Sequence, residues 1–159
     1  LLGPPVLAAT ATAAALGLRF DALVRADQIS SLIAFADRRP DLPIVLDHAG
    51  KPDIAAGAWS PWADDIARLA ERPHVVCKLS GLLTEAGGRA GDADLAPYVD
   101  HLLETFGPSR LLWGSDWPVL ILAGDYPSWR DQSLRLLGAL SADEQAAILG
   151  GVAQRFYDL

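Results

Sequence analysis

The stretch PIVLDHAGKP, residues 43–52, decides the fold class of this chain. Its first half is a nearly continuous apolar run, which is typical of a strand buried on both faces of a parallel sheet. Two polar residues, Asp47 and His48, follow, and Gly50 and Pro52 then turn the chain. The stretch therefore predicts a buried parallel strand that carries polar side chains at its carboxyl end.

Three further apolar runs of this kind lie on either side of that stretch. Together they predict four strands: Arg19–Val24, Pro43–His48, His74–Ser80 and Arg110–Asp116. The strand starts lie 24 to 36 residues apart, which is the length of a strand plus a crossover helix. We expect an α/β fold with a parallel sheet, either an open doubly wound sheet or part of a (β/α)8 TIM barrel. No glycine-rich phosphate loop follows a strand, which weakens the dinucleotide-binding form of the open sheet.

Apolar residues at helical spacing fill the segments between these strands. The predicted helices are Val6–Leu16, 29–36, 66–70, 95–106, 134–140 and, after a capping box at Ser141, a last helix to about Phe156. We expect no helical period between the fourth strand and about Ser128. The apolar N-terminal segment, residues 1–18, does not fit a signal peptide, because it lacks the basic region of one and is interrupted by Pro4 and Pro5.

Composition excludes several classes of protein. Hydrophobic residues make up 51% and charged residues 21%, which rules out a disordered chain. Thirteen Lys and Arg against twenty Asp and Glu give a net charge of −7, so we expect neither a nucleic-acid nor a membrane partner. The single cysteine, Cys77, fits a cytoplasmic protein. The sequence contains no methionine, which favours a processed chain or a fragment.

The carboxyl ends of the second and fourth predicted strands carry the candidate chemistry. His48 is the last residue of the second predicted strand. It is either a functional residue or a buried histidine that is hydrogen-bonded to a backbone carbonyl. Asp116 ends the other within GSDWPV, where an unpaired carboxylate would lose hydration. Its alternative role is to cap a helix. We expect His48, Ser80 and Asp116 to lie together at one end of the sheet, because the carboxyl ends of parallel strands share a side.

Other polar residues receive weaker assignments. Lys78 needs a partner inside a barrel, and Asp116 or a substrate anion is the expected one. Arg25, Lys51 and Trp117 lie just beyond strand ends, where they would contact a substrate or face solvent.

Three residues are assigned structural roles. We expect Cys77 to be a small core residue and His74 to lie at the opposite, amino end of the sheet. His101 falls in the predicted helix 95–106 and is expected to be solvated or packed there.

The motifs LDHAGKP, CKLSGL and GSDWPV, in this order and separated by helices, resemble the amidohydrolase-related TIM-barrel hydrolases. The closest branch is that of the sugar-lactone and 2-pyrone-4,6-dicarboxylate lactonases. The resemblance extends to the closing GGVAQRFY and implies strands five to eight, with His48 on strand six and Asp116 on strand eight. Residues 1–159 would then form the C-terminal part of one barrel domain, since a whole barrel needs about 250 residues.

Two features depart from the family pattern. The family begins with a His-x-His pair on strand one, and this sequence contains none; Val152 stands where the family usually has Asn. A half barrel would also leave the edges of its outer strands unpaired, so we expect it to be marginally stable or to form a homo-oligomer. Its inward face is expected to look onto water.

The resemblance implies a hydrolase that opens the lactone ring of a sugar acid or dicarboxylate, a small-molecule substrate. Asp116 would act as general base and His48 would polarise the carbonyl, with Arg25, Lys78, Ser80 and Trp117 binding the substrate. His48 and Asp116 would be metal ligands if the intact enzyme binds a divalent metal such as zinc. The alternatives are a metal-dependent decarboxylase of the same broad family and an inactive fragment.

Overall fold

The computed structural model describes all 159 residues and contains one sheet of four parallel strands. The strands are β1 (Phe20–Ala22), β2 (Ile44–Leu46), β3 (Val75–Leu79) and β4 (Leu111–Trp113). They pair in chain order, β1 with β2, β2 with β3 and β3 with β4. The predicted α/β fold with a parallel sheet is therefore confirmed. Each strand lies inside its predicted range but is shorter, because the chain leaves the ladder before the polar residues that follow.

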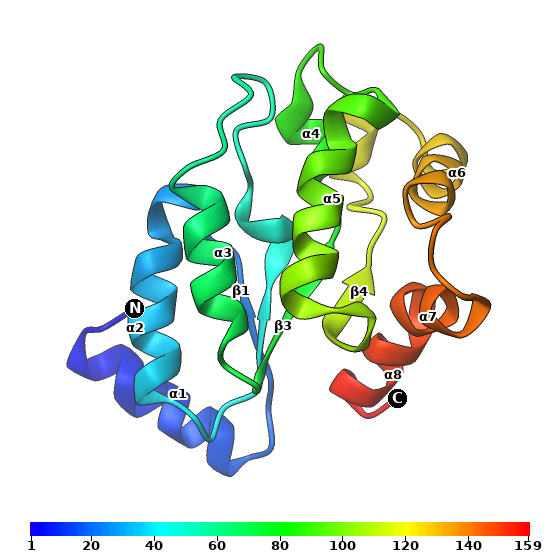
Figure 1. Cartoon of the computed structure of the whole chain (residues 1–159). Coiled ribbons are helices and arrows are strands. Elements are labelled where there is room, and N and C mark those ends of the chain that lie inside the picture. Colours follow the sequence, from blue (N-terminus) through cyan, green and yellow to red (C-terminus); the bar gives the residue numbers. More distant parts are fainter.

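Eight α-helices connect and flank the strands (Figure 1). They are α1 (Pro4–Ala15), α2 (Ile29–Arg38), α3 (Trp62–Ala70), α4 (Leu82–Ala86), α5 (Asp92–Phe106), α6 (Tyr126–Leu136), α7 (Ala142–Ala146) and α8 (Val152–Tyr157). Helices α2, α3 and α5 form a row in front of the strands in Figure 1, and the carboxyl ends of the strands point to its top. None of the helices has the length and apolar character needed to cross a membrane.

The main core lies between this row of helices and one face of the sheet. It contains 33 buried residues, among them Ile44, Leu46 and Cys77 from the strands and Phe35 and Ile66 from the helices. A doubly wound sheet reverses its strand order and carries helices on both faces. The strands of this sheet follow one another in chain order, which is the order of strands within a (β/α) barrel. The prediction that Cys77 is a core residue is confirmed.

The opposite face of the sheet is covered by the end of the chain. Val45, Val76 and Leu112 form a second apolar cluster with Val152 of α8, and Phe156 packs against it. The expectation that this face looks onto water is therefore wrong over these residues. The side chains of the α8 segment are apolar on the side toward the strands, and burying them there removes both surfaces from water.

Two helix predictions need correction. Helix α6 begins at Tyr126, earlier than predicted, because the Asp125 side chain accepts the Ser128 N–H and caps it. The capping box at Ser141 is confirmed, but the expected single last helix is divided into α7 and α8 by a π-helical turn over Ala147–Gly151. Helix α4 and the short 3-10 turn Val119–Leu122 were not predicted from the sequence.

Candidate active site

Three polar side chains from three different strand ends meet at the carboxyl end of the sheet. His48 Nδ1 lies 2.9 Å from Ser80 Oγ, and His48 Nε2 lies 3.5 Å from Asp116 Oδ1. The His48 and Asp116 side chains are 21% and 10% exposed, and Ser80 is 1% exposed. The structure thus brings together the three residues that were expected to cluster. Because Ser80 occupies Nδ1, Nε2 is the ring nitrogen that remains for a ligand.

Unusual backbone conformations bring these side chains to their positions. His48 has φ 52° and Asp116 has φ 60°, both in the left-handed region that residues with a side chain rarely adopt. The chain after β2 therefore turns sharply, and the His48 ring points across the strand ends toward Ser80. Gly81, at φ 68°, makes room for it, since a Cβ there would lie 2.7 Å from His48 Cβ.

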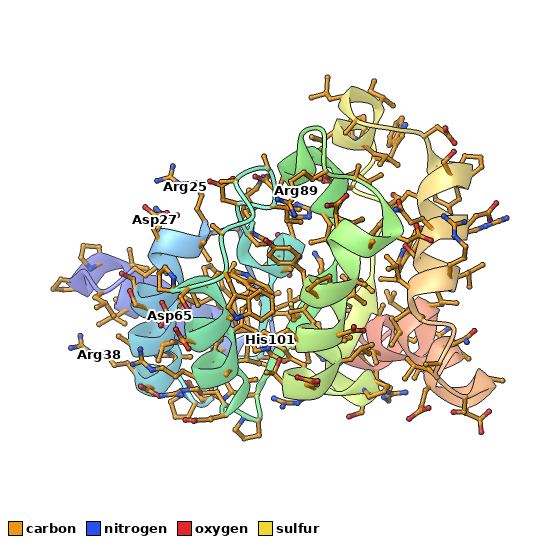
Figure 2. All side chains as sticks on the ribbon, turned by 45° about the horizontal axis from the view of Figure 1, so that its top comes forward. Arg25, Asp27, Arg38, Asp65, Arg89 and His101 are labelled. Carbon is orange, nitrogen blue, oxygen red and sulfur yellow. The ribbon has the colours of Figure 1, made fainter.

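The two other histidines lie outside this cluster. His74 precedes β3 at the amino end of the sheet, as expected, and burial lowers the pKa of its imidazole. His101 is packed on the side of α5 that faces α3, where its Nε2 lies 2.8 Å from the Ala63 carbonyl oxygen (Figure 2).

Lys78 does not contact Asp116, so that predicted pairing is wrong. Its ammonium lies 2.7 Å from both Asp21 Oδ2 and Asp47 Oδ1. Asp21 and Lys78 lie on the same face of the sheet as Val45, and Asp47 ends that row on the neighbouring strand. Burial lowers the pKa of Lys78, but the hydrogen bonds to Asp21 and Asp47 outweigh burial and raise it above its ordinary value.

Tyr157 completes this group, because its hydroxyl donates to Asp21 Oδ2 at 2.8 Å. Asp21 could have been found from the sequence as an acid in the middle of the predicted strand Arg19–Val24, on the face that alternation gives it. Tyr157 lies in the terminal helix, and no sequence signal places that helix over the sheet.

The predicted substrate-binding residues beyond the strand ends are spread around the rim. Arg25 is exposed and pairs with Asp27 at 3.2 Å, and Figure 2 shows the two beside each other on the outer side of the molecule. Lys51 pairs with Glu85 at 2.5 Å. These residues line a hollow of about 330 Å³ together with Ala26 and Asp53. Trp117, next to Asp116, is 70% exposed.

His48 and Asp116 fit two of the ligand positions of a zinc ion. Zinc binds His nitrogen and Asp oxygen tetrahedrally at about 2.0–2.2 Å, which sets neighbouring donor atoms about 3.4 Å apart. The 3.5 Å between His48 Nε2 and Asp116 Oδ1 agrees with this spacing. A catalytic zinc normally has three protein ligands, and the chain contains no group of three His, Cys, Asp or Glu side chains placed to hold a metal. These two residues alone would therefore form an incomplete site.

Comparisons with known proteins agree with this geometry. A family model described as amidohydrolase matches residues 2–159. An L-fucono-1,5-lactonase from Burkholderia ambifaria is 46% identical over 144 residues, which are 88% of this chain and 50% of that protein. A 4-sulfomuconolactone hydrolase from Rhizobium radiobacter is 37% identical over 78 residues, 49% of this chain and 26% of that protein.

A solved structure shares the fold over nearly the whole chain. The zinc-bound crystal structure of an amidohydrolase from Burkholderia multivorans superposes with a TM-score of 0.94 at 39% identity, over 99% of this chain and 58% of that one. The chain thus spans about half the length of the curated relatives it matches over most of its length.

Proposed function

Because the chain belongs to the amidohydrolase family, we propose that it forms the C-terminal half, strands five to eight, of a (β/α)8 barrel hydrolase that opens a lactone ring. The observation that carries this proposal is the cluster of His48, Ser80 and Asp116 at the carboxyl ends of the strands, where barrel enzymes carry their chemistry. The relatives named as lactonases support the reaction class over the decarboxylase alternative. The substrate is a small molecule, and the free, buried Cys77 fits a reducing cytoplasm.

Asp116 is the general base in this proposal. Its carboxylate takes a proton from water while the water oxygen attacks the lactone carbonyl carbon. The ring C–O bond then breaks, and the leaving ring oxygen takes that proton to become the hydroxyl of the product hydroxy acid. A carboxylate held beside the reacting oxygen typically contributes about 10²–10⁴-fold to such a reaction.

His48 acts through Nε2, the ring nitrogen that Ser80 leaves free. In the absence of a metal, an Nε2–H would donate to the carbonyl oxygen and stabilise the negative charge that develops there. His48 and Asp116 would hold a divalent metal together with ligands from the other half of the barrel. When bound, such an ion supplies Lewis-acid polarisation of the carbonyl.

The hollow at the rim favours a neutral, hydroxylated lactone. Its two cations, Arg25 and Lys51, each already pair with a carboxylate, and Asp53 adds a further acid. The residues that line this hollow can donate hydrogen bonds to sugar hydroxyls and accept hydrogen bonds from them. They offer no unpaired cation that could bind a second carboxylate or a sulfonate of the substrate. Arg25 and Trp117 are the substrate-binding residues of the proposal, whereas Ser80 orients the His48 ring and Lys78 supports the site through Asp47.

Assays of the full-length enzyme test this proposal. Acid release from L-fucono-1,5-lactone and from an anionic muconolactone is measured in parallel with carbon dioxide release. We expect kcat/KM to be at least tenfold higher for the sugar lactone, with no carbon dioxide. Carbon dioxide release would instead support the decarboxylase. Residues 1–159 expressed alone serve as a control and are expected to be inactive; hydrolysis by them would contradict the half-barrel assignment.

A further inference from the structure

The turn that carries His48 is built from four consecutive left-handed residues. His48, Ala49, Gly50 and Lys51 have φ values of 52°, 51°, 69° and 51°. Only Gly50 adopts this region without a steric penalty. A run of this kind persists only where surrounding groups hold it in place. The position of the His48 ring therefore depends on whatever fixes this turn.

One buried hydrogen bond ties the middle of the turn to the rest of the molecule. Trp62 Nε1–H donates to the Ala49 carbonyl oxygen at 2.7 Å, and Trp62 is 2% exposed. The last residue of the turn, Lys51, forms an ion pair with Glu85, and both of these side chains are more than a quarter exposed. Exposed ion pairs of this kind hold geometry weakly, whereas a buried carbonyl that loses its donor is costly.

Trp62 is itself rigidly held. It is the first residue of α3, and its ring contacts those of Tyr98 and His101 on α5, with centroids 5.2 and 5.4 Å away. Trp59 packs against the same ring at 5.6 Å. Since neighbouring rings surround the indole, its N–H cannot turn away from Ala49 without disturbing the packing of α3 on α5.

We propose that Trp62 is a positioning residue: its indole N–H fixes the Ala49 carbonyl and thereby the left-handed turn that directs the His48 ring toward Ser80 and Asp116. Trp62 touches no reacting atom in this role. That Trp62 holds the turn is argued from the geometry alone. The expected effect of Trp62 on turnover rests on the proposed function.

The test removes the indole N–H and leaves the shape of the ring. In the full-length enzyme, Trp62 is replaced by β-(3-benzothienyl)alanine, which has sulfur in place of the N–H. The matched control is Tyr98→Phe. It removes a hydrogen bond from the same aromatic cluster to the backbone of the same connection, Tyr98 Oη to the Ala58 oxygen at 3.0 Å, but leaves the turn untouched.

The direct readout is hydrogen exchange at the Lys51 amide, which donates to the His48 carbonyl across the turn at 2.8 Å. We expect this amide to exchange about tenfold faster in the benzothienyl variant and at the wild-type rate in Tyr98→Phe. In the same variant kcat should fall about tenfold with KM nearly unchanged. Unchanged Lys51 exchange in the benzothienyl variant, or equal acceleration by Tyr98→Phe, would overturn the proposal. If the wild-type enzyme opens no lactone, the proposed function fails while the exchange result still decides the role of Trp62.

Discussion

The two ends of the sheet use their polar groups in different ways. At the amino end, the Arg110 guanidinium donates to backbone carbonyls from three neighbouring segments, those of Ala70, Arg72, Val75 and Thr105, at 2.8 to 3.4 Å. At the carboxyl end, His48 contacts both Ser80 and Asp116, and two of the three residues, His48 and Asp116, have a left-handed backbone conformation.

This difference indicates that polar groups at the amino end of the sheet stabilise the fold, whereas those at the carboxyl end serve the proposed reaction. At the amino end, the polar side chain of Arg110 satisfies backbone carbonyls of the surrounding segments. At the carboxyl end, the polar side chains of His48, Ser80 and Asp116 lie together, with His48 Nε2 beside the Asp116 carboxylate. We therefore expect substitutions at the amino end to change the free energy of unfolding and substitutions at the carboxyl end to change turnover.

Asp116→Asn should have the largest effect. The amide keeps the shape of the side chain but cannot accept a proton, so kcat of the full-length enzyme should fall about 10²–10⁴-fold with the free energy of unfolding nearly unchanged. Asp125→Asn is the matched control, because Asp125 is a helix cap whose role Asn can fill, and its kcat should stay at the wild-type value. Equal kcat for both variants would show that Asp116 is only a cap.

Arg110→Met should lower stability without slowing turnover. Methionine keeps much of the apolar stem but leaves the carbonyls without their donor, and the contact of the guanidinium with the Phe106 ring is lost. We expect the free energy of unfolding to fall by about 2–3 kcal/mol in denaturant titrations of the full-length enzyme. Arg130→Met, at an exposed pair with Asp131, should change it by less than about 0.5 kcal/mol. A lower kcat in Arg110→Met at temperatures where it is folded would break the division between the two ends.

Ser80→Ala should reduce kcat by about tenfold, because it removes the hydroxyl that fixes His48 Nδ1. Ser133→Ala removes an equally buried hydroxyl, which donates to the Trp129 carbonyl, accepts from Trp113 Nε1 and does not contact His48. That control should lower stability and leave kcat unchanged. If the two serine variants lose activity equally, burial alone explains the effect of Ser80.

The pH dependence contributed by His74 should be the smallest effect. Burial lowers the pKa of His74 below its ordinary value of 6.5, so the unfolded chain binds a proton more readily than the folded protein. The contribution of His74 to stability is therefore complete above pH 6.5 and declines as the pH falls below it. His74→Gln should flatten this part of the stability–pH curve. An identical curve for the variant would show that His74 does not titrate differently on folding.

Much of the architecture followed from the sequence because it depends on local patterns. Apolar runs located the four strands, and the parallel arrangement then required His48 and Asp116 to lie at the same end of the sheet. The predicted pairing of Lys78 with Asp116 was wrong. Asp116 was favoured for its place in a motif, whereas the register of the strands puts Asp21 and Asp47 beside the Lys78 ammonium. The path of α8 across the sheet and the bond from Trp62 to Ala49 could not be predicted, since both depend on tertiary packing with no local signal.

The central claim is that His48 and Asp116 act as one site, and a double-mutant cycle tests it most directly. kcat/KM for lactone hydrolysis is measured for the full-length enzyme, His48→Asn, Asp116→Asn and the double variant. Residues that act as a unit show strongly non-additive losses. We predict that the double variant loses no more than about threefold beyond the worse single variant. Losses that multiply in the double variant would contradict the claim, because His48 and Asp116 would then contribute independently.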